Sequence, residues 1–311
     1  MGKILIGTCS WTDPSLIKAG TFYPPEANDA ESRLRYYAEN FPIVEVDSSY
    51  YALPQRRTAE LWAERTPQHF KFDVKAFSLF TNHPTRPASL PRDIAKAMGP
   101  LPEGKNNLYY RDVPQEVRNE LWIRFKEALT PLHDARKLGL VLLQFPHWFY
   151  PSRESLDHIL ACAEKLKPMR CSVEFRSASW LNEKHRDSTL AFLRDNDLPF
   201  VCVDEPQGFK SSVPPLAAVT ADIALVRFHG RNVETWEKKG LTTAERFNWY
   251  YSQAEMSDWV PKLRQMASQA SEVHALMNTN YGDQGIVNAR LLARLLGQLE
   301  TTQELFARPN L

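Results

Sequence analysis

Charged and polar side chains recur at alternate positions near the ends of short apolar segments, a pattern suited to acid–base chemistry. Glu174 and Arg176 are separated by one residue, and so are Arg227 and His229. A carboxylate or an imidazole can accept and donate protons, while a guanidinium binds phosphate or carboxylate groups through paired hydrogen bonds. Because side chains of a β-strand alternate between its two faces, each pair should point to one side. The two pairs predict a common polar cleft.

The same spacing recurs in other apolar segments of the chain. Their alternate positions are mostly Val and Phe, which should face covering helices, so the polar positions should point into the same cleft. An unpaired buried ion costs several kcal/mol, so these groups must pair with one another, contact water or hold a ligand. The polar positions in these segments are Glu45, Asp47 and Ser49, Asp73 and Lys75, Asp204, and Asn278 and Asn280.

The first interpretation of this cleft is an enzyme for a small anionic or polyhydroxylated substrate, such as a sugar phosphate or a sugar acid. Glu174 or Asp204 would be the general base or acid, and His229 the proton partner. Glu174 should stay ionised beside Arg176, which suits a base better than an acid. The reaction stays open among hydrolysis, elimination and isomerisation. Glycoside hydrolysis is disfavoured, because several cations are unusual beside an oxocarbenium-like centre.

The predicted substrate-binding residues are of three kinds. Cations would hold the anion, polar residues would orient it, and aromatic rings near the strand ends would stack against it. The cations are Lys75, Arg176 and Arg227, the polar residues are Glu45, Asp47, Gln144, Asn278 and Asn280, and the rings are Trp11, Tyr51 and Trp180.

Three other interpretations remain open. The acids and cations nearly balance, so a self-satisfied ion network without a ligand would also explain the pattern. A divalent metal, as in sugar isomerases or phosphodiesterase-like nucleases, is disfavoured because Arg176 and Arg227 would repel it, and no cofactor is predicted. A loop could bind nucleic acid, but the net charge of +1 makes that unlikely. The metal ligands would be Glu45, Glu174, Asp204 and His229; the loop residues would be Trp236, Lys238, Lys239, Arg246 and Trp249.

The elements that position these residues are apolar segments alternating with helical ones, which indicates a parallel sheet. The first strand ends in Gly7-Thr8-Cys9-Ser10-Trp11, without the glycine-rich turn typical of a doubly wound nucleotide-binding sheet. A closed (β/α)8 barrel of the TIM type is therefore preferred. The predicted strands are Ile4–Trp11, Ile43–Tyr51, Phe70–Phe77, Leu138–Phe145, Arg170–Arg176, Phe200–Glu205, Ala224–Gly230 and Val273–Asn280.

Helices are expected where apolar residues recur every three or four positions. Val117–Lys137 and Val287–Leu299 are examples, Asp29 and Ser152 are expected N-caps, and the Pro-rich segment Pro206–Ala221 is expected to be only partly helical. Two long excursions follow the third and seventh strands, Ser78–Gln115 and Arg231–Tyr251. In barrels the loops after the strands carry the site, so both are candidate lids. His83, His147 and His185 are interpreted as surface or loop residues.

Composition sets the wider limits. The chain has 311 residues, 43% hydrophobic and 24% charged, and reads as one soluble domain over residues 1–311. The first apolar run, Ile4–Ile6, is too short for a signal peptide, and no stretch approaches the length of a membrane span. The four cysteines are scattered, without metal or redox spacing. We expect a cytoplasmic protein with a small-molecule substrate; the oligomeric state stays open.

An ordered set of motifs resembles the DUF72 (YecE-like) family over nearly the whole chain. The resemblance implies a TIM-type barrel with a polar mouth, and it implies no established reaction. The chain has Asp47 where the family commonly has Asn, and Thr81-Asn82-His83 where the family has a Thr-His pair. The matching motifs are Gly7–Trp11, Phe22–Pro24, Val44–Tyr51, Phe72–Ala76, Leu143–Pro146, Val173–Arg176 with Ser179-Trp180, Val203-Asp204, Arg227–Arg231 and Met277–Asn280.

Overall fold

The computed structural model describes residues 1–299, and its strands form one parallel sheet of eight. The sheet runs in the order β5-β4-β3-β2-β1-β8-β7-β6, and a bridge from Val173 to Phe200 joins its two edges. The prediction of a (β/α)8 barrel is confirmed. The strands are β1 (Lys3–Cys9), β2 (Ile43–Val46), β3 (Lys71–Lys75), β4 (Leu138–Gln144), β5 (Cys171–Glu174), β6 (Val201–Asp204), β7 (Ile223–Phe228) and β8 (Glu272–Met277).

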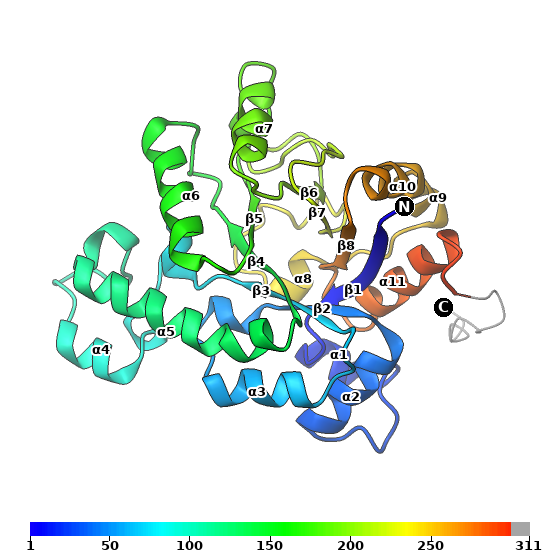
Figure 1. Ribbon diagram of the computed structural model, residues 1–311, viewed down its shortest axis with the longest axis horizontal. Coiled ribbons are helices and arrows are strands. Elements are labelled where there is room, and N and C mark those ends of the chain that lie inside the picture. Colours follow the sequence, from blue (N-terminus) through cyan, green and yellow to red (C-terminus); the bar gives the residue numbers. More distant parts are fainter. Residues whose placement is uncertain (300–311) are drawn as a thin grey trace.

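Helices surround the strands on the outside (Figure 1). The predicted N-caps are present: Asp29 forms a capping box with Ser32, and the Ser152 hydroxyl accepts from the Ser155 amide. The predicted single domain includes residues 300–311, which lie outside the described residues. The helices are α1 (Pro14–Ala19), α2 (Ala30–Asn40), α3 (Arg56–Glu64), α4 (Arg92–Met98), α5 (Gln115–Asp134), α6 (Arg153–Leu166), α7 (Arg186–Asp195), α8 (Thr243–Arg246), α9 (Gln253–Ser257), α10 (Trp259–Gln269) and α11 (Gln284–Leu295).

Two predictions about the elements were wrong in detail. Several strands are shorter than predicted: β2 stops at Val46, and a 3-10 turn, η1 (Ser48–Tyr50), follows it. The segment between β6 and β7 contains no helix. Its prolines, at 206, 214 and 215, lack the amide hydrogen that a helix needs. No helix among residues 1–299 is long and apolar enough to cross a membrane.

The register of the strands fixes which side chains point into the barrel. Glu45 lies beside Cys9 and Asp73, and Gln144 lies beside Glu174. Because neighbours in a parallel register point to the same side, these residues belong to the inward set. Arg227 lies beside Val203, whereas Phe228 lies beside Asp204.

The end of the barrel opposite the mouth is closed by a second buried polar cluster. His274 on β8 contacts Asp73 through Nδ1 at 2.8 Å and Glu272 through Nε2 at 3.3 Å. The other oxygen of Asp73 accepts from the Leu140 amide at 2.7 Å. Burial alone would lower the pKa of His274, but the carboxylates of Asp73 and Glu272 raise it to about 9. This histidine is therefore a buried cation at neutral pH.

Candidate active site

Arg227, on β7, lies at the centre of the barrel mouth with no exposed surface. Its Nε and Nη2 donate to the two oxygens of Glu45, at 2.9 and 2.5 Å, and its Nη1 donates to Glu174 at 2.7 Å. Gln144 accepts from the same Nη1 at 3.2 Å. Both edges of the guanidinium are thus occupied by protein groups. The sequence prediction brought these residues together correctly, but Arg227 has no free edge for a substrate.

Glu174 joins this cation to His229. Its Oε1 contacts His229 Nε2 at 3.2 Å, while Asn278 Nδ2 donates to His229 Nδ1 at 2.9 Å. Because Nδ1 accepts a hydrogen bond, the ring proton sits on Nε2 and is donated to Glu174. Burial and the charge of Arg176 lower the pKa of His229 to about 3, so the ring is neutral. Burial alone would raise the pKa of Glu174, but Arg227 holds it well below its usual range.

Arg176 links the buried network to the open side of the mouth. Its Nη1 contacts Glu174 at 3.2 Å and Glu205 at 2.9 Å, and its guanidinium lies 4.8 Å from the ring centre of Trp236. Its side chain keeps 15% of its surface exposed. Burial raises the pKa of Glu205 to about 7, against the opposing charge of Arg176. The pair can therefore change its charge by one proton near neutral pH.

Lys75 and Asp47 form the second open part of the mouth. Lys75 Nζ lies 3.6 Å from Asp47 Oδ1 and 4.6 Å from the ring centre of Tyr50, and the two charged side chains are 14% and 24% exposed. Burial alone would raise the pKa of Asp47, but Lys75 lowers it. A contact of 3.6 Å is too long for a hydrogen bond. The ammonium therefore keeps donors available for a third partner.

His83 completes the mouth, although the sequence interpretation treated it as a surface or loop residue. It follows the 3-10 turn η2 (Ser78–Thr81), its side chain is largely buried, and its Nδ1 lies 3.0 Å from the Thr81 hydroxyl. Its ring packs edge-on against Tyr50 and Trp148, at 5.3 and 6.1 Å. Burial and the charges of Lys75 and Arg176 lower the pKa of His83 to about 3. Its Nε2 has no hydrogen-bond partner among residues 1–299.

The prediction that Asp204 points into the mouth was wrong. Asp204 shares a side with Phe228 and points outward, under α9 and α10. Its carboxylate accepts from Arg231 at 2.8 and 2.7 Å, from the Tyr251 hydroxyl at 2.7 Å and from Trp259 Nε1 at 2.7 Å. Both oxygens of Asp204 accept two hydrogen bonds each on the outer face of the sheet, so this carboxylate is not available for catalysis. Glu205, the next residue, is the inward acid that the sequence interpretation missed.

Two of the predicted stacking rings also lie outside the mouth. Trp180 is buried between Phe175 and Phe149 and donates to the Phe149 carbonyl at 2.6 Å. Trp11 is buried edge-on against Trp62 and Phe72, on the outer side of the sheet. Aromatic rings near strand ends here fill the layer between sheet and helices.

The remaining predicted residues lie at the rim. Tyr51 is 60% exposed and packs edge-on against Tyr50, the ring that Lys75 contacts. Asn280 is half-buried and donates to Asn278 at 3.4 Å, which extends the chain of amides that holds His229. Tyr51 and Asn280 are therefore near the mouth without closing it.

The excursion at 231–251 covers one side of the mouth. Trp236 and Phe247 pack against the ring of His229, at 6.4 and 5.7 Å. Trp236 is buried, and Arg246 donates to its carbonyl, so neither side chain offers an exposed nucleic-acid surface. The loop is a cover over His229, which explains why this imidazole is buried.

The residues proposed as metal ligands do not converge. Glu45 and Glu174 both bind Arg227, which lies between them, and Asp204 points to the other side of the sheet. Within residues 1–299 no group of three or more His, Cys, Asp or Glu side chains is placed to hold a metal ion. The alternative built on these four ligands is contradicted by the geometry.

Comparison with known proteins agrees with the resemblance in the motifs. The family model described as "Protein of unknown function DUF72" matches residues 5–310. UPF0759 protein YunF of Bacillus subtilis (strain 168) is 32% identical over 297 residues, which cover 94% of each chain. A crystal structure of a DUF72 family protein from Enterococcus faecalis V583 superposes with a TM-score of 0.75 at 25% identity and covers 96% of both chains. One from Thermotoga maritima MSB8 gives 0.71 at 28% identity and covers 95% of this chain and 99% of its own.

Proposed function

This chain belongs to the DUF72 family, and from that premise we propose that its barrel mouth is an active site for proton transfer. The substrate is a small anion with hydroxyl groups, of the sugar phosphate or sugar acid class. One observation carries the proposal: His83, whose Nε2 has no partner among residues 1–299, packs against Tyr50, the same ring that the partly exposed Lys75 contacts. Burial and the charges of Lys75 and Arg176 lower the pKa of this imidazole, so it is neutral. Such a combination can bind an anion and accept a proton from it.

The two cations are the anion-binding groups. Lys75 is loosely paired with Asp47, and Arg176 shares its Nη1 between Glu174 and Glu205, so both keep donors for a ligand. Arg176 also stacks on Trp236, which fixes the plane of the guanidinium. A fixed guanidinium recognises a phosphate or carboxylate at lower entropic cost than a free one.

His83 is the proposed general base. In the free protein burial opposes its protonation, and the positive charges of Lys75 and Arg176 add to that effect. A bound anion offsets those charges, so the pKa of His83 should rise toward its ordinary value only in the complex. The base would therefore become effective when substrate is present. Because the Thr81 hydroxyl contacts Nδ1 of His83, Nε2 is the nitrogen that can accept the substrate proton.

The buried network below is a positioning device. Arg227, Glu45, Glu174 and His229 have almost no exposed surface, so they act on a substrate through Arg176 and through their field. Fixed charges in a site that excludes water are worth more than the same charges in water. Glu174, which the sequence predicted to be a base that touches the substrate, is instead proposed to position Arg176.

A ligand-binding function without catalysis is the second candidate. The burial of Glu174 and Arg227 favours it, because a paired and sealed ion network needs no reaction to explain it. Both candidates use Lys75 and Arg176 to bind an anion. They differ in whether the bound molecule is changed.

The test is to incubate the protein in D2O with a panel of sugar phosphates and sugar acids and to follow both substrate and product signals by proton NMR. We expect exchange or conversion of at least one compound, about 100-fold slower in His83→Asn. His69→Asn, which alters an exposed histidine, is the matched control. Binding without exchange or conversion would contradict the proposed enzymatic function and support ligand binding without catalysis. Equal rates in His83→Asn would remove His83 as the base.

A further inference from the structure

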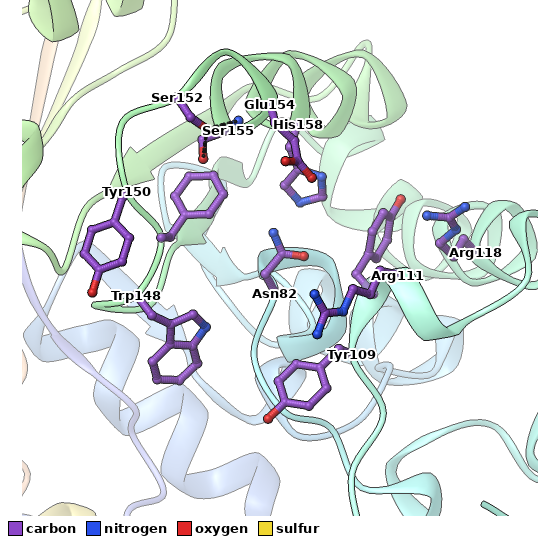
Figure 2. Close-up of a pocket in the computed structure, with 12 residues that line it drawn as sticks. Asn82, Tyr109, Arg111, Arg118, Trp148, Tyr150, Ser152, Glu154, Ser155 and His158 are labelled. Carbon is purple, nitrogen blue, oxygen red and sulfur yellow. Dashed lines mark hydrogen bonds between the residues drawn. The ribbon is translucent and has the colours of Figure 1, made fainter. Parts of the chain in front are cut away.

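A cavity of about 840 Å³ lies beside the mouth, between the excursion at 78–115 and the start of α6. This volume is within the range of sites for small molecules and cofactors. Figure 2 shows Trp148 and Tyr150 on one side of the hollow, Arg111 and Tyr109 on another, and Asn82 between them. None of the residues predicted from the sequence as site residues lines it, and it is called the loop cavity below.

We propose that the loop cavity binds a ligand that carries a flat ring and a phosphate group, of the mononucleotide class. The cavity would hold the non-reacting part of the substrate, so this use rests on the proposed function of the mouth. Binding itself is a separate property of the cavity. Three features carry the inference: its exposed rings, its unpaired arginines and its position.

The rings of the loop cavity are unusually accessible. Tyr109, Trp148 and Tyr150 are 39%, 42% and 57% exposed, and all three line this one hollow. Large rings in a folded chain are normally covered, and rings that gather around one concavity with their faces open mark a binding surface. Stacking against a planar base is the interaction that such rings offer.

The charge of the cavity selects an anion. Arg111 and Arg118 line it, and among residues 1–299 neither lies within 4 Å of a carboxylate, whereas Lys75, Arg176 and Arg227 of the mouth are each paired with one. Arg118 lies 4.8 Å from the ring centre of Tyr110, which holds its guanidinium in place. Glu154 is the one acid in the lining. Two arginines without carboxylate partners are the groups expected for a phosphate.

Hydroxyl and amide groups provide the polar contacts that a sugar needs. Ser152 and Ser155 line the cavity at the start of α6, and Asn82 faces them across the hollow in Figure 2. Asn82 has a φ of 61°, which asparagine adopts more readily than most residues, and this turn sets both Asn82 and His83 in place. The residue inserted relative to the family motif is thus part of the cavity wall.

The cavity and the mouth share a wall. Trp148 lines the cavity, and its ring packs against His83 at 6.1 Å, while Asn82 and His83 are consecutive. A ligand seated on Trp148 therefore lies against the ring that also contacts the proposed base, His83. A single-stranded nucleic acid would use the same rings, but the cavity lining offers its backbone two arginines and one acid, Glu154.

The test is calorimetric titration with AMP, adenosine, ribose 5-phosphate and a ten-base oligodeoxyadenylate. We expect AMP to bind roughly ten-fold more tightly than either adenosine or ribose 5-phosphate. Arg111→Ala should weaken AMP about ten-fold and leave adenosine unchanged, whereas Tyr150→Ala should weaken both. Arg153→Ala and Tyr281→Ala, which alter exposed residues outside the cavity lining, are the matched controls.

The outcomes separate this inference from the proposed function. If AMP binds as expected and no compound is exchanged or converted, the proposal for the loop cavity is supported and the proposed enzymatic function of the mouth is contradicted. If AMP binding is abolished in Lys75→Met and unaffected in Arg111→Ala and Tyr150→Ala, the ligand sits in the mouth and the loop cavity is overturned. Failure of AMP to bind, or much tighter binding of the oligonucleotide, also overturns it.

Discussion

Glu174 and Arg227 form an ion pair 2.7 Å long in which neither side chain has any exposed surface. The same guanidinium holds Glu45 at 2.5 Å, and burial raises the pKa of Glu45 to about 8 against the opposing charge of Arg227. Burying these three charged groups is costly, and the cost is offset only while all three are present. Glu45, Glu174 and Arg227 therefore form a paired, rigid floor of the mouth.

The first prediction concerns the stability of this floor. Arg227→Met leaves the buried Glu45 without its guanidinium partner and leaves Glu174 paired with Arg176 alone, so we expect the free energy of unfolding to fall by about 3–5 kcal/mol. Urea denaturation followed by circular dichroism measures it. Arg153→Met removes an exposed arginine and should change the free energy by less than ~0.5 kcal/mol. A loss below ~1 kcal/mol in Arg227→Met would contradict the view that the network is tightly coupled.

The second prediction separates two neighbouring acids. Asp204→Asn replaces an oxygen that accepts from Arg231, Tyr251 or Trp259 by an amide donor, so we expect a loss of about 2–3 kcal/mol in stability. Because Asp204 points away from the mouth, phosphate affinity should stay unchanged in the folded variant. Glu205→Gln should instead change the affinity for phosphate and leave the free energy of unfolding nearly unchanged. Urea denaturation measures the stability of both variants, and calorimetric titration measures their affinity for phosphate. A change of phosphate affinity in Asp204→Asn but not in Glu205→Gln would place Asp204, not Glu205, in the mouth.

These two acids show why the sequence predicted only part of the site. Alternation placed Glu174, Arg176, Arg227 and His229 on the inner face correctly, because an outward phenylalanine separates the members of each pair. In Val201–Glu205 the rule that apolar residues face the helices failed. On β6 the inward positions below the mouth are themselves apolar, because Val201 lies beside Leu225 and Val203 lies beside the inward Arg227. The next inward residue is then Glu205 and not Asp204.

Residues on loops were beyond the reach of alternation. His83 enters the mouth through a turn after β3, and Arg111 reaches the loop cavity from within the same excursion. The spacing of residues within a loop does not predict where that loop returns to the barrel. The fold itself followed from eight apolar segments and their helical partners, because these regular periods depend on local residues. Trp11 and Trp180 lie at strand ends, but sequence does not state which side of the sheet a ring covers.

The third prediction concerns His274 at the closed end of the barrel. Its pKa of about 9 exceeds that of an unfolded histidine, so its pairing stabilises the fold fully below about pH 6.5. That contribution, on the order of 3 kcal/mol, should be lost as the pH rises from about 6.5 through 9. Urea denaturation at intervals from pH 6 to pH 10 measures it. In His274→Gln this pH-dependent contribution should be absent, and an identical decline in wild type and variant would assign it to other groups.

The fourth prediction couples anion binding to proton uptake. An anion held by Arg176 competes with Glu205 for the guanidinium, so it should raise the pKa of Glu205 above its free value of about 7. The same anion should raise the pKa of His83 from about 3, because it offsets the charges of Lys75 and Arg176. Each group whose pKa rises on binding takes up protons, so affinity for phosphate should increase as the pH falls from 8 to 6.

Calorimetric titration with inorganic phosphate in two buffers of different ionisation enthalpy measures this uptake directly. We expect up to about half a proton taken up per phosphate bound near pH 7, since Glu205 is already half-protonated there. Glu205→Gln should lose most of the uptake while it still binds phosphate, because Lys75 and Arg176 remain. Phosphate's own second ionisation, near pH 7, is removed by repeating the titration with sulfate, which stays fully ionised. Proton uptake with sulfate that persists in Glu205→Gln would mean that another group, not this buried carboxylate, responds to the anion.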